Sequence, residues 1–528
     1  MSIHNLDSYK DHPLLAENQD LVRVLQLFSS ISDHPRPSKQ EDSVRAYLIN
    51  VAKEQDWKVE QDQTGNVAFQ VPATKGKEDI MPVVMQGHMD IVTFPNDSHL
   101  PRQAEIVDKG SDGKEQGLWM QTIGQEMTLG SDNGIGVSLA MATMMDTSFE
   151  HGPVTILLTV NEETGMTGAK NLDSRLIPQT GILLNLDSEE GSAKICIGCA
   201  GSADSVASFR IGDRETIPEG YTMMDLELKG FPGGHSGVQI HLGFGNAIQS
   251  MADLLSRLQK AAGDLRLVKF DGGEKRNAIP SRARSTIAIP ESTVDSLYTE
   301  IKAFVDELKQ GKEVPDKSVT GELLKHNAQN VEVSLIPTQS VELTEALSSE
   351  LAARLLGVIA DTPTGPFHSA ELPNVGNLIT LSNNLGTVTT KTEDIEVVNM
   401  TRGAHIEELT AKIARIRELY ISRGSILKHT EEPTSGWLED PKKSAAVSIV
   451  TDAVRKAAGD AKWMAYHAGL ESGIVAGKAK GEMSAVSIGP LVVDAHTPRE
   501  RVHLPSIVDE LKALREIFAQ TLNQHTTQ

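Results

Sequence analysis

The sequence PVVMQGHMDIV, residues 82–92, joins an apolar run to a histidine and an aspartate two positions apart. The apolar run is typical of a buried strand. Side chains alternate between the two faces of a strand, so His88 and Asp90 share a face only while the chain stays extended. A histidine and a carboxylate at the end of a strand suggest a metal ligand and the group that orients it.

Segments of helical and strand character alternate around this stretch over the first 200 residues. The sequence predicts helices at 43–55 and 136–146 and strands at 66–71, 82–87, 154–160 and 181–187. This alternation is typical of an α/β fold. The polar segment 103–117 is rich in turn formers and predicts an exposed loop or hairpin.

The pattern changes from about residue 203. Alternating strands at 222–230 and 286–290, a helix at 246–262 and a polar stretch at 309–324 predict a separate α+β unit. Near residue 430 the α/β pattern returns, with helices at 445–459 and 505–522 and a strand at 484–489. The simplest topology is an α+β domain of residues 203–430 inserted into an α/β domain of residues 1–202 and 431–528.

The composition excludes several classes of protein. The 528 residues include 50 basic and 72 acidic side chains, a formal net charge of −22, so we expect neither a nucleic-acid nor a membrane partner. No signal peptide and no run of ~20 apolar residues is evident, which indicates a cytoplasmic protein. Cys196 and Cys199 lack the further Cys or His of a zinc site, and we interpret them as buried thiols rather than a redox pair.

Acidic and histidine side chains follow several predicted strands. They are His88 and Asp90, Glu162 and Glu163, Asp187 with Ser188, Glu189 and Glu190, and His496, while Asp132 precedes a helical run. Open α/β sheets bind ligands at the carboxyl ends of their strands, so these side chains should converge on one crevice. Imidazoles and carboxylates without thiolates suit zinc, cobalt or manganese, and a carboxylate can bridge two ions.

Eight motifs strengthen this interpretation: HMDIV, LGSDNGIG, TVNEETGMTGA, NLDSEE, GGHSG, GGEKRNAIP, HAGLESG and AHTP. In this order, from about residue 20 to the C-terminus, they resemble the co-catalytic zinc metallopeptidase family that includes aminoacylase, carboxypeptidase G and carnosinase. The resemblance implies a zinc-peptidase-like α/β/α catalytic domain with an inserted α+β lid domain. Within the family it points to dipeptidases that act on Xaa-His substrates such as β-alanyl-histidine.

The resemblance also implies roles for individual residues. Two Zn²⁺ ions per chain, replaceable by Mn²⁺ or Co²⁺, would be bound by His88 and Asp187, by Glu163 and His496, and by a bridging Asp132. Asp90 would orient His88 through a hydrogen bond. Glu162 would be the general base that takes a proton from the metal-bridging water and later gives it to the leaving amine.

Other roles remain open for four of these residues. Asp132 could cap the helix that follows it. Glu162 and Glu163 could be a solvated pair on a turn, and Asp90 could serve at the surface or as a cap.

The resemblance makes His235, on the glycine-flanked GGHSG turn, a lid residue that hydrogen-bonds the developing oxyanion. The alternative is a solvated histidine on a hairpin. His241 and Asn246 could shape the same site. Four residues, Arg276, Asn277, Asn384 and Arg402, are candidates for binding the substrate carboxylate or ordering the lid. We prefer Arg402, because a guanidinium binds a carboxylate through two hydrogen bonds.

The HAGLESG motif places His467 and Glu471 near His496, and Glu471 could accept the free amino group of the substrate. The predicted function is hydrolysis of unblocked dipeptides, and the alternative is hydrolysis of N-acyl amino acids by the same metals. A metal-free binding protein would have no reason to keep the five ligands. DNGIG and GFGNA lack the strand and helix context of a dinucleotide-binding loop.

Two departures from the family pattern stand out. Residues 366–386 are longer than the family pattern predicts, and the last motif has threonine at 497 where serine is usual. The lid domain is about twice the minimal length. Either a duplicated half completes the substrate site within one chain, or the extra length makes contacts in a homodimer.

Overall fold

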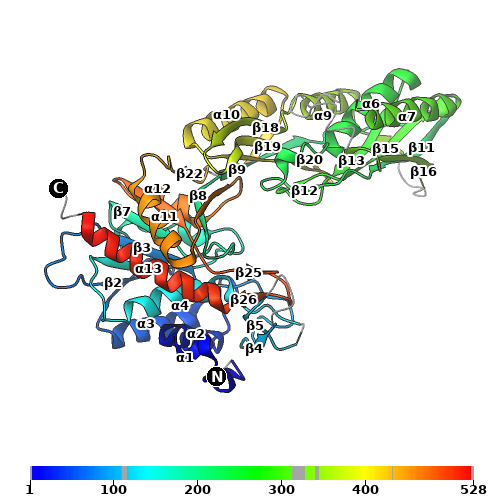
Figure 1. The fold of residues 1–528 in the computed structure, drawn as a ribbon. Coiled ribbons are helices and arrows are strands. Elements are labelled where there is room, and N and C mark those ends of the chain that lie inside the picture. The colour runs from blue at the N-terminus through cyan, green and yellow to red at the C-terminus, as the bar shows by residue number, and fades with distance from the viewer. Residues whose placement is uncertain are drawn as a thin grey trace.

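The computed structural model describes residues 3–109, 116–124, 126–311, 327–338, 344–430 and 432–524. Figure 1 shows an α/β lobe that contains both ends of the chain and an elongated second lobe that extends away from it. No helix in the described part of the chain is both long and apolar enough to cross a membrane.

The α/β lobe is built on a nine-stranded sheet, named here the central sheet. Its order is β1-β2-β6-β3-β7-β24-β8-β22, with β23 beside β8. The strands are β1 (Lys58–Gln61), β2 (Val67–Val71), β3 (Val83–His88), β6 (Val154–Thr159), β7 (Gly181–Asn185), β8 (Lys194–Cys199), β22 (Trp437–Leu438), β23 (Lys462–Tyr466) and β24 (Met483–Ser487). Strand β3 is parallel to both β6 and β7, so the segments after these three strands meet at one edge.

Helices cover both faces of the central sheet. One apolar cluster packs α2 (Gln19–Ser32), α3 (Asp42–Glu54), α4 (Ser131–Met144), α11 (Ala445–Ala458) and α13 (Leu504–Gln524) against it. The other face carries α5 (Thr167–Lys170) and α12 (Glu471–Lys478). Alternate residues of β3 belong to different clusters, with Val83 and Met85 in the first and Val84 in the second. The predicted α/β/α arrangement is therefore confirmed.

A small sheet beside the central sheet has the order β25-β26-β5-β4. Its strands are β4 (Ala104–Asp108), β5 (Leu118–Thr122), β25 (Val492–Val493) and β26 (Arg501–His503). Strands β4 and β5 are antiparallel, which agrees with the predicted hairpin, although residues 110–115 lie outside the described part. The remaining short helices of this lobe are η1 (Leu6–Tyr9), α1 (Pro13–Ala16) and η2 (Ser174–Leu176).

The second lobe is built on another nine-stranded sheet, named here the lid sheet. Its order is β16-β11-β15-β13-β19-β20-β9-β21, with β18 beside β19. The strands are β9 (Gly201–Arg210), β11 (Tyr221–Lys229), β13 (Arg266–Gly272), β15 (Arg282–Pro290), β16 (Glu332–Pro337), β18 (Gly365–Leu372), β19 (Gly376–Thr390), β20 (Asp394–Gly403) and β21 (Ile426–Thr430). The unexpectedly long segment 366–386 contributes to the β18–β19 hairpin.

Four helices lie side by side on one face of the lid sheet (Figure 1). They are α6 (Ala247–Ala262), α7 (Val294–Lys309), α9 (Ser349–Asp361) and α10 (Ile406–Ser422). The smaller elements of this lobe are β10 (Glu215–Thr216), β12 (Gly234–His235), β14 (Ala278–Ile279), β17 (Glu345–Ala346), η3 (Ile240–Leu242) and η4 (Glu291–Thr293). Most of the predicted polar stretch 309–324 lies outside the described residues.

The lid sheet consists of two units with the same topology. One runs β11-α6-β13-β15-α7-β16 and the other β9-α9-β19-β20-α10-β21. In each unit the four strands lie in the order fourth, first, third, second. The units join edge to edge where Gly272 of β13 pairs with Val388 of β19. The first unit is therefore inserted into the second unit, between strand β9 and helix α9.

The chain passes between the two sheets at two adjacent places. Strand β8 ends at Cys199 and β9 begins at Gly201, while β21 ends at Thr430 and β22 begins at Trp437. A side chain at Gly201 would collide with the Thr434 carbonyl, so only glycine allows the two crossing segments to approach this closely.

Candidate metal centre

Three carboxylates and two imidazoles meet beyond the ends of β3, β6 and β7. His88, the last residue of β3, places its Nε2 atom 2.9 Å from Asp132 Oδ1 and 3.5 Å from Asp187 Oδ1. His496 places its Nε2 atom 2.8 Å from Asp132 Oδ2 and 3.0 Å from Glu163 Oε2. Asp132 thus lies between the two imidazoles and turns one oxygen toward each.

The donor atoms fit divalent cations. His88 Nδ1 is 3.0 Å from the Asp90 backbone carbonyl, so in a neutral ring Nδ1 carries the hydrogen and Nε2 has the lone pair. That lone pair faces the Asp132 carboxylate, so the two groups need either a proton or a metal cation between them. Glu163 Oε1 and Asp187 Oδ1 are also buried without hydrogen-bond partners. Two groups, His88–Asp132–Asp187 and Asp132–Glu163–His496, each have their ligand atoms within 4.8 Å of one another.

Electrostatics support this interpretation. Hydrogen bonds to Asp132 and Glu163 raise the pKa of His496 to about 11. Burial lowers the pKa of His88, but Asp187 and Asp132 overcome that effect and raise it well above its usual value. Burial raises the pKa of Asp187 to about 6. The carboxylates therefore create a strong demand for positive charge at both imidazoles.

Asp90 organises the turn that carries the two glutamates. Its side chain is 0% exposed, and its carboxylate accepts hydrogen bonds from the backbone N–H of Glu162 at 2.9 Å and of Glu163 at 3.2 Å. Ser38 Oγ donates a third at 2.8 Å. His88 is oriented mainly through the Asp90 carbonyl, because the carboxylate lies 3.6 Å from Nδ1. The surface alternative for Asp90 is therefore wrong.

The alternatives for the other acidic residues also fail. Both Asp132 oxygens face imidazoles, Oδ1 that of His88 and Oδ2 that of His496, so Asp132 does not serve as the cap of α4. The Glu163 side chain is 5% exposed, which is incompatible with a solvated pair. Burial raises the pKa of Glu162 well above its usual value.

The loop of residues 36–41 supports the site and was not anticipated from the sequence. Arg36 donates to the Met89 carbonyl at 3.1 Å and to the Gly130 carbonyl at 2.8 Å. Glu41 accepts the Asn161 N–H at 2.9 Å, and Ser38 binds Asp90 as described above. One loop thus contacts the segments that carry His88, Asp132 and Glu162, and a proline–serine pair between two helices is its only sequence signal.

His235 lies in a cavity of about 290 Å³ lined by both units of the lid sheet and by the central-sheet lobe. Its Nδ1 atom accepts the backbone N–H of Gly237 at 3.2 Å and of Val238 at 3.1 Å. The ring hydrogen must therefore be on Nε2, which leaves that atom as a donor. Burial lowers the His235 pKa, so the ring stays neutral. These contacts lie within the turn itself and the ring is half-buried, so the lid role of His235 stays a prediction.

Arg402 lines the same cavity and is 5% exposed. Burial and the nearby Arg276 lower its pKa to about 10. Arg276 is ion-paired with Asp204, whereas no carboxylate among the described residues lies within ion-pair distance of Arg402. Its Nε atom is also buried without a partner. Lys170 also lines the cavity without an ion-pair partner among the described residues, so Arg402 is the buried cation of the cavity with free capacity to bind an anion.

Other predicted lid residues order the backbone. Asn384 Nδ2 donates to the carbonyls of Arg276 at 3.0 Å and Ala278 at 2.8 Å. The Asn277 carbonyl accepts the Ser236 N–H at 2.9 Å. Asn384 therefore fixes the loop that in turn holds the His235 turn.

Two further residues of the inserted domain were proposed to shape the site. Asn246 caps α6 through the Ile248 N–H at 3.0 Å and donates to the Leu385 carbonyl at 2.9 Å. His241 is exposed on η3 and does not line the cavity.

The two residues of the HAGLESG motif are buried. His467 Nε2 is 2.7 Å from Ser382 Oγ, and burial lowers its pKa to about 3. Glu471 is 0% exposed and accepts hydrogen bonds from Gln86 Nε2 at 2.6 Å and Thr159 Oγ1 at 2.5 Å. The structure therefore does not bring Glu471 to the substrate's amino group, because the first turn of α12 directs it into the central sheet. The thiols of Cys196 and Cys199 are free and buried, as predicted.

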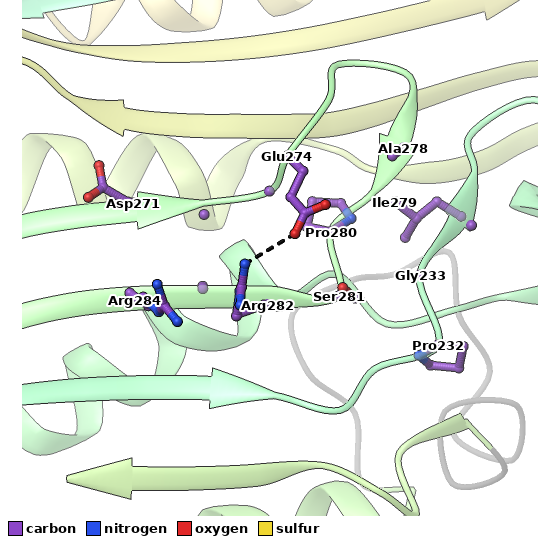
Figure 2. A pocket seen from close by; sticks show the side chains of 14 residues that line it. Pro232, Gly233, Asp271, Glu274, Ala278, Ile279, Pro280, Ser281, Arg282 and Arg284 are labelled. Atoms are coloured by element: carbon purple, nitrogen blue, oxygen red, sulfur yellow. Dashed lines mark hydrogen bonds and ion pairs between the residues drawn. The ribbon is translucent and has the colours of Figure 1, made fainter. Parts of the chain in front are cut away.

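A second cavity of about 360 Å³ lies in the lid sheet between β12–β14 and the ends of β13 and β15. Figure 2 shows Arg282 paired with Glu274 inside it. None of the metal-ligand candidates lines this cavity or the cavity that contains His235. The charged groups of the second cavity already have partners, so it offers no free charge to a substrate.

The fold and this cluster of imidazoles and carboxylates define a metallopeptidase of the co-catalytic class. Residues 226–313, mostly in the first unit of the lid sheet, match the model of a peptidase dimerisation domain. The cytosol non-specific dipeptidase of Escherichia coli is 33% identical over 496 residues, which are 94% of this chain and 96% of that protein.

Solved structures agree with this relationship. The aminoacylhistidine dipeptidase of Vibrio alginolyticus has a TM-score of 0.78 and 30% identity over 94% of this chain and 96% of that chain. A Staphylococcus aureus tripeptidase shares the fold, with a TM-score of 0.53 and 14% identity over 96% of this chain and 99% of that chain. This chain belongs to the M20 peptidase family.

Proposed function

We propose that this protein hydrolyses the peptide bond of unblocked dipeptides with the help of two divalent cations. The observation that carries the proposal is the position of Asp132, whose two oxygens face His88 and His496 separately. His88 and Asp187 would hold one ion, Glu163 and His496 the other, and Asp132 both. We propose Zn²⁺ as the metal, with Mn²⁺ or Co²⁺ as substitutes, because nitrogen and oxygen ligands discriminate weakly among these ions.

Bound ions would lower the pKa of a water molecule and polarise the scissile carbonyl. Glu162 is suited to accept the proton of that water, because its ligand atom lies within 4.8 Å of those of His88 and Glu163. Its raised pKa favours transient protonation. Glu162 then returns the proton to the leaving amine. Asp90 keeps Glu162 in place through the backbone N–H.

The lid residues would bind the rest of the substrate. His235 offers Nε2–H as a donor to the oxygen that becomes negative during attack. Arg402 would bind the C-terminal carboxylate through two hydrogen bonds. A carboxylate fixed by a buried arginine leaves no room for another residue after it, so tripeptides should be poor substrates.

The substrate class follows from the relatives. The E. coli and V. alginolyticus proteins are by name a non-specific dipeptidase and an aminoacylhistidine dipeptidase, which supports dipeptides in general and histidine in the second position. The former name also supports a cytoplasmic location. Glu471 is enclosed, so it does not explain how a free amine is preferred over an N-acyl group, and N-acyl amino acid hydrolysis is the alternative to test.

The test combines metal analysis with a substrate panel. The protein as purified should contain up to two divalent ions per chain, and chelators should abolish turnover until metal is restored. The panel contains β-alanyl-histidine, glycyl-histidine, aliphatic dipeptides, tripeptides and N-acetyl amino acids. Faster turnover of N-acetyl amino acids than of every dipeptide would show that N-acyl amino acids, and not dipeptides, are the substrate class.

A further inference from the structure

Glu500 is a buried carboxylate with an unusual set of partners. It follows His496 by four residues on the loop before β26 and is 1% exposed. One oxygen, Oε2, accepts the backbone N–H of Leu129 at 2.9 Å and of Gly130 at 3.1 Å. The other, Oε1, accepts Ser131 N–H at 2.7 Å, Ser131 Oγ–H at 2.6 Å and Asp132 N–H at 3.2 Å.

These donors lie in the segment that leads into α4, where Asp132 and Asn133 do not have helical backbone angles. The residue before the helix is Gly130, with φ of 71°, and it has no side chain that could cap those groups. Aspartate often accepts such N–H groups near the start of a helix, but both Asp132 oxygens face imidazoles. Glu500 supplies the acceptors from a distant part of the sequence. Asp132 is thereby left free to face both imidazoles.

Arg36 holds the same segment from its carbonyl side. It donates to the Gly130 carbonyl and to the Met89 carbonyl beside His88. The positive charge of Arg36 is also attracted by the negative charge of Glu500. The segment 129–132 is thus held by an arginine from the 36–41 loop and by a glutamate from the His496 loop.

We propose that Glu500 is a positioning residue for the metal centre, which holds Asp132 so that one carboxylate can serve both ions. The inference rests on the proposed function. A carboxylate is required because both of its oxygens accept. A glutamine would direct its NH₂ group at two or more N–H donors and leave buried groups unpaired.

The test measures metal affinity in the full-length protein. Chelator-treated wild type and variants are titrated with Zn²⁺ in competition with a chromophoric chelator, below the melting temperature of each metal-free protein. We expect Glu500→Gln to bind about 10–100-fold more weakly, the usual loss when a group supporting a metal ligand is removed. Glu500→Asp keeps two accepting oxygens on a shorter side chain, and its affinity for Zn²⁺ should lie between those of wild type and Glu500→Gln. Glu510→Gln makes the same chemical change at a buried site elsewhere and should bind as wild type does.

Ser131→Ala keeps the measurement informative if Glu500→Gln does not fold. It removes the single Oγ–H donor and should weaken binding less than Glu500→Gln would. Wild-type affinity in Glu500→Gln, or in both Glu500→Asp and Ser131→Ala, would overturn the positioning role. A wild-type protein that binds no divalent ion would instead overturn the proposed function.

Discussion

Glu162 and Glu163 are adjacent in the sequence but have different surroundings. Glu163 Oε2 is 3.0 Å from His496 Nε2, which is where a ligand belongs, whereas Glu162 is proposed as the base. Glu162→Gln keeps the shape but cannot accept a proton, so we expect kcat to fall by at least ~10²–10⁴-fold with unchanged metal content. Glu163→Gln should lose or readily exchange one ion, and excess metal should restore part of the activity.

Metal stoichiometry and kcat of both variants, with and without excess zinc, check this assignment. Metal loss in the Glu162 variant together with full occupancy in the Glu163 variant would reverse the two roles.

Arg402 should act on substrate binding. Arg402→Ala removes the buried cation without a carboxylate partner, so KM for dipeptides should rise far more than kcat falls. Arg402→Lys should not fully restore KM, because an ammonium cannot form the same pair of parallel hydrogen bonds. Arg282→Ala, which changes an arginine of the second lid cavity, is the matched control and should leave KM unchanged. An unchanged KM in Arg402→Ala would contradict the proposal that Arg402 binds the C-terminal carboxylate of the substrate.

At the scale of elements, much of the fold could be predicted because strands and helices leave local patterns. The strands before His88, Glu162 and Asp187 are apolar runs, and their parallel pairing brings their ends together as expected. The site residues that were missed have long-range partners instead: Glu500 accepts the Ser131 N–H from 369 residues away. The direction of Glu471 depends on how α12 packs against the sheet, which no local pattern records.

Helix α13 contains a buried carboxyl that should make stability depend on pH. Glu510 is 0% exposed with both oxygens unpartnered, and burial raises its pKa to about 8. The folded state binds the proton of Glu510 more tightly than the unfolded state does. The stability that this proton gives the folded state is present at pH 4 and is lost as the pH rises through about 8. Glu510→Gln should therefore raise the melting temperature of the metal-free protein at pH 9 more than at pH 5. An equal change at both values would contradict the assignment.

At the scale of the whole molecule, the duplicated lid sheet raises the question whether one chain or two chains supply the lid residues of each site. His235 belongs to the first unit and Arg402 to the second, and both line one cavity with residues of the central-sheet lobe. The second unit is continuous with the first through β13 and β19. A single chain therefore brings His235 and Arg402 to one cavity, although none of the metal-ligand candidates lines it. We predict from this arrangement that both residues serve the site of their own chain, whether or not the protein forms a homodimer.

A mixing experiment tests that conclusion. His235→Ala and Arg402→Ala are each inactivating or strongly impairing on the proposed mechanism, and the two variants are unfolded, combined in equal amounts and refolded together. If both residues act within one chain, the mixture should be no more active than the average of the two variants. If His235 served the site of a second copy, random pairing in a two-fold dimer would restore about a quarter of the wild-type activity. Wild type carried through the same unfolding and refolding is the control, and activity near a quarter of its value would show that the site is shared between chains.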